Sequence, residues 1–421
     1  MDLKEKLRQI DRSVFSSQKA TSTPVRRNDH SSIEQELCGE ILESPHGACF
    51  VKRTVYPHDY RHGSYPLSSY LNQSPRLLSL AGKETAFEKV DPRRAIFIDT
   101  ETTGLSGGMG ICAFLVGIGY FTEESFIVEQ FFMNTPSEER ALLHHLNQKF
   151  RQRQIVISYN GKCFDLPLLI SRTVYHGLDR PFERLPHLDL LFTVRRLWKN
   201  VLEDCSLSTV ESRILNVARS GDVPGYLIPQ IYFDYLRSGD PRSMKGVFYH
   251  NEQDILTLVA LTTKACEVFK NPSPQNHSVD IISIGKVYEA MNEPHRSNLL
   301  YEEYLQNQSG TNHIQRKEVL IRMLFNYKRM QKWDKVKEIC ETFIAQEHFH
   351  PLPYIELAKY YEHKCKDAFR AKHFVDLALK ELQILEELRM VNFWQKYKDD
   401  LLYRRKRLQR KVQAGKPLLD L

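Results

Sequence analysis

The sequence predicts an α/β domain, in which helices flank a mixed β-sheet, followed by an all-α repeat domain. Residues 94–177 alternate between short apolar segments and amphipathic ones in the order expected for strands and helices. Beyond the breaker cluster NPSPQNHS, at 271–278, every segment has a helical pattern. The chain has 421 residues, 42% hydrophobic and 26% charged, so it is long enough for two or three such domains.

The order of elements narrows the fold class. The predicted elements are strands at 94–101, 111–121 and 124–133, a helix at 137–150, a strand at 154–161 and a helix from 165. The first three strands, joined by short connections, should form an antiparallel meander. Ser137 is the expected N-cap of the first helix. A β-β-β-α-β-α order in a mixed sheet is the layout of a ribonuclease H-like fold.

The flanking regions complete the domain organisation. We expect a flexible N-terminal segment at 1–40, the α/β domain at 41–270, helical repeats at 280–400 and a basic tail at 401–421. The segment 324–346 aligns with 358–380 at an offset of 34 residues, so that Tyr327 matches Tyr361. This period is typical of tetratricopeptide-like repeats; the alternative is an ordinary helical bundle. A strand at 47–56 is predicted, but the sequence gives residues 41–90 no role.

Composition restricts the class of protein. There are 59 Lys and Arg against 52 Asp and Glu, and the net charge of +7 weakly favours a polyanionic partner. The eight cysteines include no C-x-x-C pair, which predicts reduced, buried thiols in a cytoplasmic protein. Residues 1–15 are charged throughout, and no run of about 18 apolar residues occurs, so we expect neither a signal peptide nor a membrane span.

Two acids interrupt the first predicted strand. In "AIFIDTETTGL" Asp99 and Glu101 are two residues apart, and therefore on one face of a strand. Two buried carboxylates repel each other unless a cation lies between them. Divalent Mg²⁺ or Mn²⁺ would resolve the conflict, because both prefer oxygen ligands. The alternative is an exposed edge strand with solvated acids.

Two further acids strengthen the metal interpretation. Asp165, in YNGKCFDLP, lies at the junction of a strand and a helix, and Asp254, in YHNEQDIL, lies in a helix. His250 precedes Asp254 by four residues, and so shares its helical face. Four converging acids could hold two metal ions, an arrangement that stabilises the attacking and leaving oxygens during displacement at phosphorus.

Together these motifs resemble the DEDD exonucleases. FIDTETTGL, the N-x-x-x-F-D of NGKCFD, and a late Asp with an aromatic residue or His just before it look like that superfamily's three motifs, in order. HLDLLFTVRRLW, CSLSTVE, GDVPGYLIPQIYFDYLRSGD and YHNEQD are similar to the YprB-like family of ribonuclease H-like proteins, over roughly residues 40–400. The resemblance implies that two Mg²⁺ or Mn²⁺ ions are held by Asp99, Glu101, Asp165 and Asp254. It also implies 3′→5′ exonuclease polarity.

The third motif departs from the superfamily pattern. One DEDD branch has a His five residues before the last Asp, and the other has a Tyr four residues before it. Here Tyr249 stands at minus five and His250 at minus four. We expect His250 to orient or deprotonate the attacking water, because an imidazole is the better base near neutrality. The alternative is that His250 forms a local hydrogen bond and the metal alone activates the water.

Other polar residues are weaker candidates. By resemblance, the backbone of Thr102 and Thr103 would contact the terminal nucleotide; simple strand termination is the alternative. The tail segment RRKRLQRK could follow a nucleic-acid backbone through Arg404, Arg405, Lys406 and Arg407, or be a solvated helix end. His187 and Asp189 are ambiguous, with a helix N-terminal role expected for Asp189. For Asp222 and Asp240 turn chemistry suffices.

The sequence therefore predicts a divalent-metal-dependent 3′→5′ exonuclease acting on single-stranded DNA or RNA. The alternative is a catalytically weak or inactive nucleic-acid-binding scaffold that recruits proteins through its helical repeats. In either case the expected partners are single-stranded nucleic acid and a protein bound to the repeats, without a membrane.

Overall fold

The structure is a computed structural model that describes residues 32–104, 110–272, 279–307, 313–346, 349–388 and 394–414. Residues 1–31 of the predicted N-terminal segment lie outside the described residues, as do residues 273–278 of the predicted boundary.

A seven-stranded mixed sheet forms the centre of the first domain, with the strand order β1-β2-β7-β6-β5-β8-β9. The strands are β1 (Glu40–Ser44), β2 (Gly47–Pro57), β5 (Ala95–Thr102), β6 (Ala113–Phe121), β7 (Ser125–Phe132), β8 (Ile155–Ser158) and β9 (His187–Asp189); β3 (Arg61–His62) and β4 (Tyr65–Pro66) form a separate pair. β5, β6 and β7 are antiparallel neighbours, whereas β8 and β9 run parallel to β5. The predicted meander and mixed sheet are confirmed.

The helices of this domain are α2 (Ile33–Leu37), α3 (Pro75–Gly82), α4 (Glu139–Phe150), α5 (Asp165–Tyr175), α6 (Leu190–Trp198), α7 (Leu207–Val210), α8 (Ile228–Ser238) and α9 (Met244–Lys270). Short 3₁₀ turns lie at Leu67–Asn72, Thr85–Lys89, Pro92–Arg94, Pro136–Glu138, Pro181–Arg184, Gly225–Leu227 and Pro241–Ser243, and a π-helical turn at Glu211–Leu215. The prediction that Ser137 caps α4 is wrong, because a 3₁₀ turn precedes the helix and puts Glu138 at the cap position.

Alternation along β5 builds both layers of the core. Ala95 and Phe97 are buried in one apolar cluster with α3, α6 and α9, while Ile96 and Ile98 are buried in a second cluster with α4 and α5. Because side chains two residues apart share a face, Asp99 continues the row that faces α9. β5 lies between β6 and β8, so the alternative of an exposed edge strand is wrong.

Two glycines on β6 let α9 lie close against the sheet. A Cβ atom at Gly117 would come within 2.1 Å of the Asn251 side chain, and one at Gly119 within 2.5 Å of Ile255. Any larger residue at these positions would push the helix outward. The alternate glycines of LVGIGYF therefore determine how near the polar residues of α9 approach β5.

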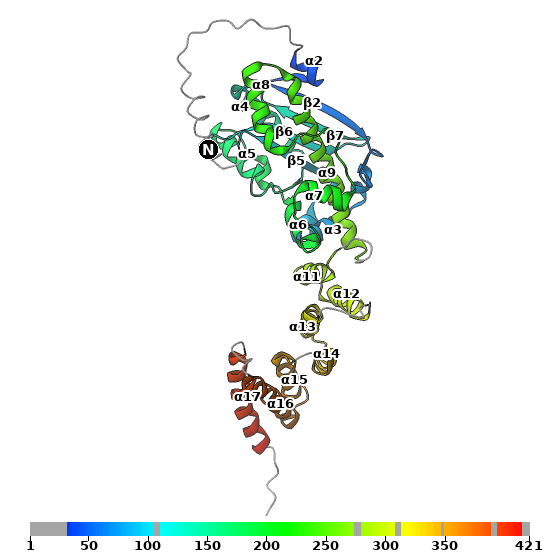
Figure 1. Cartoon of the computed structure of the whole chain (residues 1–421), viewed down its shortest axis with the longest axis vertical. Coiled ribbons are helices and arrows are strands. Elements are labelled where there is room, and N and C mark those ends of the chain that lie inside the picture. The colour runs from blue at the N-terminus through cyan, green and yellow to red at the C-terminus, as the bar shows by residue number, and fades with distance from the viewer. Residues whose placement is uncertain are drawn as a thin grey trace, which may run out of the picture.

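The second part of the chain is helical and extends away from the end of the sheet domain that carries α3 and α6 (Figure 1). Its helices are α11 (Ile281–Ala290), α12 (Pro294–Asn307), α13 (His313–Arg329), α14 (Trp333–Gln346), α15 (Pro351–His363), α16 (Ala368–Glu387) and α17 (Gln395–Ala414). Each packs against the next, and the Tyr288 hydroxyl donates to the Phe269 carbonyl at 3.0 Å across the junction. The tetratricopeptide assignment stays a prediction, and the predicted boundary at 401 falls inside α17.

The sequence predictions about membrane spans and about the cysteines can be compared with the structure. Within the described ranges, no helix is both long and apolar enough to cross a membrane. The eight cysteines are unpaired, as expected. The prediction that they are buried is wrong for Cys38, Cys163 and Cys365, which are exposed.

Candidate functional site

The four predicted metal ligands converge on one region. Asp99 and Glu101 come from the end of β5, Asp165 from the first residue of α5, and Asp254 from the middle of α9. The pKa of Asp99 is well above its ordinary value because of burial and then the charges of Asp254, Glu101 and Asp165. Since each of these charges is felt at Asp99, the acids form one cluster, although they are separated by up to 155 positions in the sequence.

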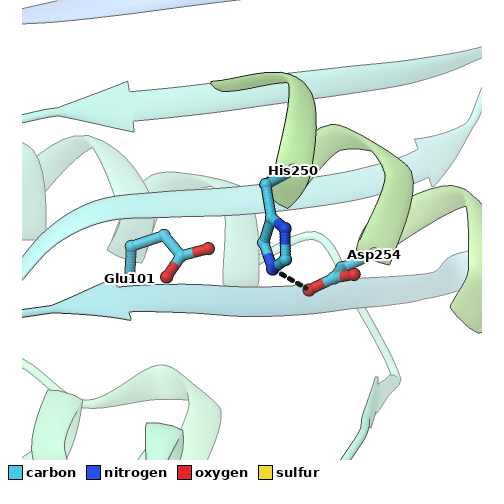
Figure 2. Close-up of side chains that lie close together, drawn as sticks. All are labelled: Glu101, His250 and Asp254. Atoms are coloured by element: carbon cyan, nitrogen blue, oxygen red, sulfur yellow. Dashed lines mark ion pairs between the residues drawn. The ribbon is translucent and has the colours of Figure 1, made fainter. Parts of the chain in front are cut away.

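Glu101, His250 and Asp254 form the tightest part of the cluster. One ligand atom from each lies within 4.8 Å of the others, and Figure 2 shows the His250 ring between the two carboxylates. His250 Nε2 is 3.6 Å from Asp254 Oδ2, as expected for residues one helical turn apart. Two carboxylates and one imidazole nitrogen together form a set of ligands that suits a divalent cation such as Mn²⁺ or Mg²⁺.

Polar partners orient the acids. Asn251, which is fully buried on α9, donates from Nδ2 to Asp99 Oδ2 at 2.9 Å. The Thr100 hydroxyl donates to Asp165 Oδ1. Burial raises the pKa of Asp165 to about 6, although the hydrogen bond from Thr100 opposes the increase. The site therefore presents carboxylates that are held in place before any cation binds.

Electrostatic repulsion within the cluster is strong. The pKa of Glu101 is also well above its ordinary value, first through burial and then through Asp254, Asp165 and Asp222, with Arg219 opposing. A group of buried carboxylates that raise one another's pKa values gains stability when a cation enters. This observation, together with the donor set, indicates that the residues suit a metal ion.

Sequence reasoning missed Arg219, which enters the cluster from an irregular segment before α8. It pairs with Asp254 and with Asp222, at 3.0 Å, and its Nε donates to Glu211 at 2.9 Å. Burial alone would lower the pKa of Arg219, but Asp254 and Glu211 raise it above its ordinary value. The structure contains a π-helical turn at Glu211–Leu215, and such turns are frequent at functional sites. The turn could have drawn attention to this region, but no sequence pattern predicts it.

Asp222 has a larger role than the turn chemistry predicted for it. It accepts from the backbone N–H of Val223 at 2.8 Å, as a turn residue would, but both of its oxygens also lie 3.0 Å from His250 Nδ1. The expectation that turn chemistry suffices is therefore wrong for Asp222. Asp240 accepts from the backbone N–H of Arg242 at 3.1 Å, as a turn residue would, and its carboxylate also pairs with the Arg242 side chain.

His187 and Asp189 support the loop that delivers Asp165. Asp189 caps α6, as expected, by accepting from the Leu191 N–H at 3.0 Å. It also accepts from the N–H groups of Asn160 at 2.8 Å and Lys162 at 3.0 Å. His187 Nε2 lies 2.7 Å from the Ser158 hydroxyl at the start of this loop. Burial lowers the pKa of His187 to about 3, so this ring is neutral.

Tyr249 lies on a different side of α9 from His250. Tyr249 lies near Tyr56 and Tyr60. The pKa of the Tyr60 phenol is raised by burial first, then by Glu252 and Tyr249. Only His250 among the two candidates is grouped with Glu101 and Asp254. This placement favours His250 as the residue that serves the site.

Thr102 and Thr103, the residues predicted to contact a terminal nucleotide, both form hydrogen bonds at the end of β5. The Thr102 hydroxyl donates to the Gly104 carbonyl at 2.9 Å, and the Thr103 N–H donates to the Cys112 carbonyl at 3.1 Å. The N–H of Thr103 is thus already used by the strand pairing. Their contact with a terminal nucleotide stays a prediction.

The basic tail is largely engaged with acids of the repeats. On α17, Arg404 and Arg407 pair with Glu362, at 3.5 and 2.5 Å, and Arg405 pairs with Asp376 at 2.8 Å. The Glu362 side chain is only 1% exposed, so these contacts hold α17 in place. Lys406 is exposed. A nucleic-acid role for the four residues stays a prediction, and Lys406 is the one best placed for it.

Comparisons with protein families, known proteins and solved structures identify the following similarities. Residues 96–266 match the model of the RNase_H superfamily. The chain is 31% identical over 355 residues to the "Uncharacterized protein YprB" of Bacillus subtilis (strain 168). The alignment covers 80% of this chain and 82% of that protein. A family B DNA polymerase from Pyrobaculum calidifontis is similar over 50% of this chain and 29% of its own, with 13% identity and a TM-score of 0.33, too low to add to the fold assignment.

Proposed function

Because the chain belongs to the YprB family and contains a ribonuclease H superfamily nuclease domain, we propose that it is a divalent-metal-dependent 3′→5′ exonuclease for single-stranded DNA or RNA. The observation that carries the proposal is the meeting of Glu101, His250 and Asp254 within 4.8 Å, beside the half-buried Asp99 and the buried Asp165. A purely structural domain would have no physical need for so many mutually repelling acids at one place.

The residues divide the work as follows. The four acids hold the cations, for which we propose two ions of Mg²⁺ or Mn²⁺. When bound, these ions stabilise charge on the phosphodiester and lower the pKa of water. Asn251 and Thr100 keep Asp99 and Asp165 turned toward the cluster. His250, whose Nε2 faces Glu101 and Asp254, orients the attacking water or accepts its proton.

Substrate and polarity rest on separate supports. The net charge of +7 favours a polyanion but does not choose between DNA and RNA. The 3′→5′ direction and the single-stranded preference come from the resemblance of the three motifs to DEDD exonucleases. Phosphodiester hydrolysis itself is supported by the acid cluster.

One observation favours the alternative of a weak or inactive scaffold. Arg219 already supplies a positive charge to Asp254 and Glu211, so the cluster is partly neutralised without a metal ion. A site that is stable in this state could retain its fold after losing activity. In that case the helical repeats would recruit a protein partner while the domain binds nucleic acid.

A digestion panel distinguishes the two functions. The purified protein is incubated with 3′- and 5′-labelled single- and double-stranded DNA and RNA, in Mn²⁺, in Mg²⁺ and in a chelator. We expect metal-dependent shortening of single strands from the 3′ end, and its loss in Asp99→Ala. The matched control is Asp234→Ala, because Asp234 is exposed and its carboxylate contacts Arg237 and Gln230 of the same helix. Binding of the strands without cleavage by the wild-type protein would support the scaffold instead.

A further inference from the structure

Arg219 has every one of its N–H groups engaged. An arginine side chain offers five donors. Nε and one Nη2 donor contact Glu211, the second Nη2 donor contacts Asp254 Oδ1, and Nη1 contacts Asp222 at 3.0 Å and the His250 carbonyl at 3.5 Å. The Arg219 side chain is only 11% exposed, so these contacts are made largely out of water.

These contacts anchor a segment that has no regular structure. Residues 216–224 lie between the π-helical turn and the 3₁₀ turn at Gly225–Leu227, outside any helix or strand. Arg219 links this segment to α9 through Asp254 and to the π-helical turn through Glu211. Arg219 therefore determines where Asp222, in the same segment, lies relative to α9.

Asp222 in turn determines the chemistry of the His250 ring. A carboxylate can only accept hydrogen bonds, so the ring nitrogen 3.0 Å from both Asp222 oxygens, Nδ1, must carry a proton. In the neutral imidazole the other nitrogen, Nε2, then has the free lone pair. Nε2 is the atom that faces Asp254 Oδ2, at 3.6 Å.

Asp254 is constrained in the same way. Its Oδ1 is occupied by Arg219, which leaves Oδ2 as the oxygen turned toward His250. The four side chains therefore form a closed cycle of contacts, from Arg219 to Asp222, His250, Asp254 and back to Arg219. This cycle of contacts places Asp254 Oδ2 and the lone pair of His250 Nε2 side by side, next to Glu101.

We propose that Arg219 and Asp222 are positioning residues of the site: Asp222 holds His250 in the Nδ1–H tautomer, and Arg219 holds Asp222 and Asp254 in register with each other. Neither residue is proposed to touch the substrate. Groups behind a reacting side chain commonly change activity by 10- to 100-fold when they are removed. The inference rests on the proposed nuclease function in its kinetic test, but not in its spectroscopic one.

The spectroscopic test measures the tautomer directly. In the full-length, metal-free protein labelled with ¹⁵N-histidine, long-range ¹H–¹⁵N correlations distinguish Nδ1–H from Nε2–H rings. The His250 signal is the one missing from His250→Gln. We expect the neutral ring of the wild-type protein to be Nδ1–H, and Asp222→Ala to shift it toward Nε2–H. A wild-type ring in the Nε2–H form would overturn the proposal, and this result does not depend on whether Asp222→Ala folds or on nuclease activity.

The kinetic test separates positioning from substrate binding. Asp222→Ala and Arg219→Lys, which keeps the charge but loses the planar fork, should each lower kcat for a short labelled oligonucleotide by ~10-fold or more, with KM changed less than about twofold. Asp234→Ala is the control, because the Asp234 carboxylate is exposed and contacts Arg237 and Gln230 of its own helix. An increase in KM without a decrease in kcat would contradict the proposal. Complete inactivity of the wild-type protein would instead contradict the nuclease function, and the tautomer would still decide the positioning role.

Discussion

At the scale of single residues, three of the four acids each have a specific donor. Asn251 serves Asp99, Thr100 serves Asp165 and Arg219 serves Asp254. Hydrogen bonds to an ionised carboxylate favour its charged form and fix its direction. Burial and mutual repulsion act in the opposite sense, and they prevail at Asp99 and Asp165, whose pKa values are raised. Without metal, Asp99 and Asp165 therefore bind protons more tightly than free carboxylic acids do.

The pKa of Asp165, raised to about 6, predicts how stability changes with pH. The folded state binds this proton more tightly than the unfolded state, so the stabilisation is present below about pH 4 and is lost as pH rises through about 6. Asp165→Asn keeps an acceptor for Thr100 but does not titrate. In chelator, the wild type should lose stability relative to Asp165→Asn as pH rises across this window. The difference between their free energies of unfolding should change by at most about 3 kcal/mol.

Urea unfolding of both proteins between about pH 4 and pH 7 measures this difference. Asp234→Asn provides the control, because Asp234 is exposed and its carboxylate contacts Arg237 and Gln230 within α8. A difference between Asp165→Asn and the wild type that does not change with pH would show that Asp165 does not titrate in this window.

The choice between His250 and Tyr249 gives a second prediction at this scale. His250 faces Asp254, whereas Tyr249 lies beside Tyr56 and Tyr60. His250→Ala should lower turnover by ~10²-fold, if the imidazole serves the attacking water. Tyr249→Phe is the matched control and should keep turnover near that of the wild type. Single-turnover cleavage of a labelled oligonucleotide measures both, and a reversed pattern would move the role to Tyr249.

What the sequence could reveal at this scale depended on local spacing. Asp99 and Glu101 are two residues apart on one strand, and His250 and Asp254 are one helical turn apart, so periodicity alone pairs them. Arg219 reaches Asp254 across 35 positions, from a segment without periodic structure. No sequence pattern specifies such a contact, because it depends on how an irregular segment folds over α9.

At the scale of elements, the packing of α9 on the sheet decides whether the site assembles. β5, β6 and β7 could be predicted because their apolar runs are long, and β9 could not, because its three residues resemble the start of the following helix. A helix that contains His250 and Asp254 could be predicted, but its start at Met244 could not. The closeness of α9 to β5 follows from Gly117 and Gly119, whose importance appears only when the two elements are seen together.

A substitution at Gly117 tests this packing. A Cβ there would lie 2.1 Å from Asn251 Oδ1, so Gly117→Ala should push α9 away and weaken the Asn251–Asp99 hydrogen bond. We expect a loss of about 1–3 kcal/mol in the free energy of unfolding, as for overpacked cores. Metal-dependent cleavage should fall with it. The control is Gly110→Ala, where a Cβ meets nothing within 4 Å. Full stability and activity in Gly117→Ala would mean that α9 tolerates a shift without disturbing Asp99.

At the scale of the whole molecule, the two parts of the chain share a continuous apolar core. Phe269 at the end of α9 and Tyr288 on α11 belong to the same buried cluster, which continues into the later helices. Arg76 of the sheet domain also pairs with Glu293 at the start of α12. The breaker cluster at 271–278 suggested a domain boundary, but sequence patterns could not reveal this packing, because it joins residues from separate elements.

The basic tail belongs to this scale, since its charges are divided between folding and a possible nucleic-acid contact. Glu362 is buried and accepts Arg407 at 2.5 Å and Lys411 at 2.7 Å. Deleting residues 404–421 would leave this acid without these partners, and removing one side of a buried ion pair typically costs about 3–5 kcal/mol. Such a deletion would therefore mix a loss of stability with any loss of binding, and single substitutions are the sharper test.

The last prediction compares Lys406 with Arg407. Lys406→Gln should leave the melting temperature unchanged but reduce the slope of log Kd against log salt by about 0.7 for a long single strand, if this side chain neutralises one phosphate. Arg407→Gln should lower the melting temperature, because Arg407 pairs with the buried Glu362. Dissociation constants at several salt concentrations, measured with the inactive Asp99→Ala background to prevent cleavage, give the slopes. Equal slopes for Lys406→Gln and its parent would show that this residue does not contact the nucleic-acid backbone, and would leave α17 a purely structural end of the repeats.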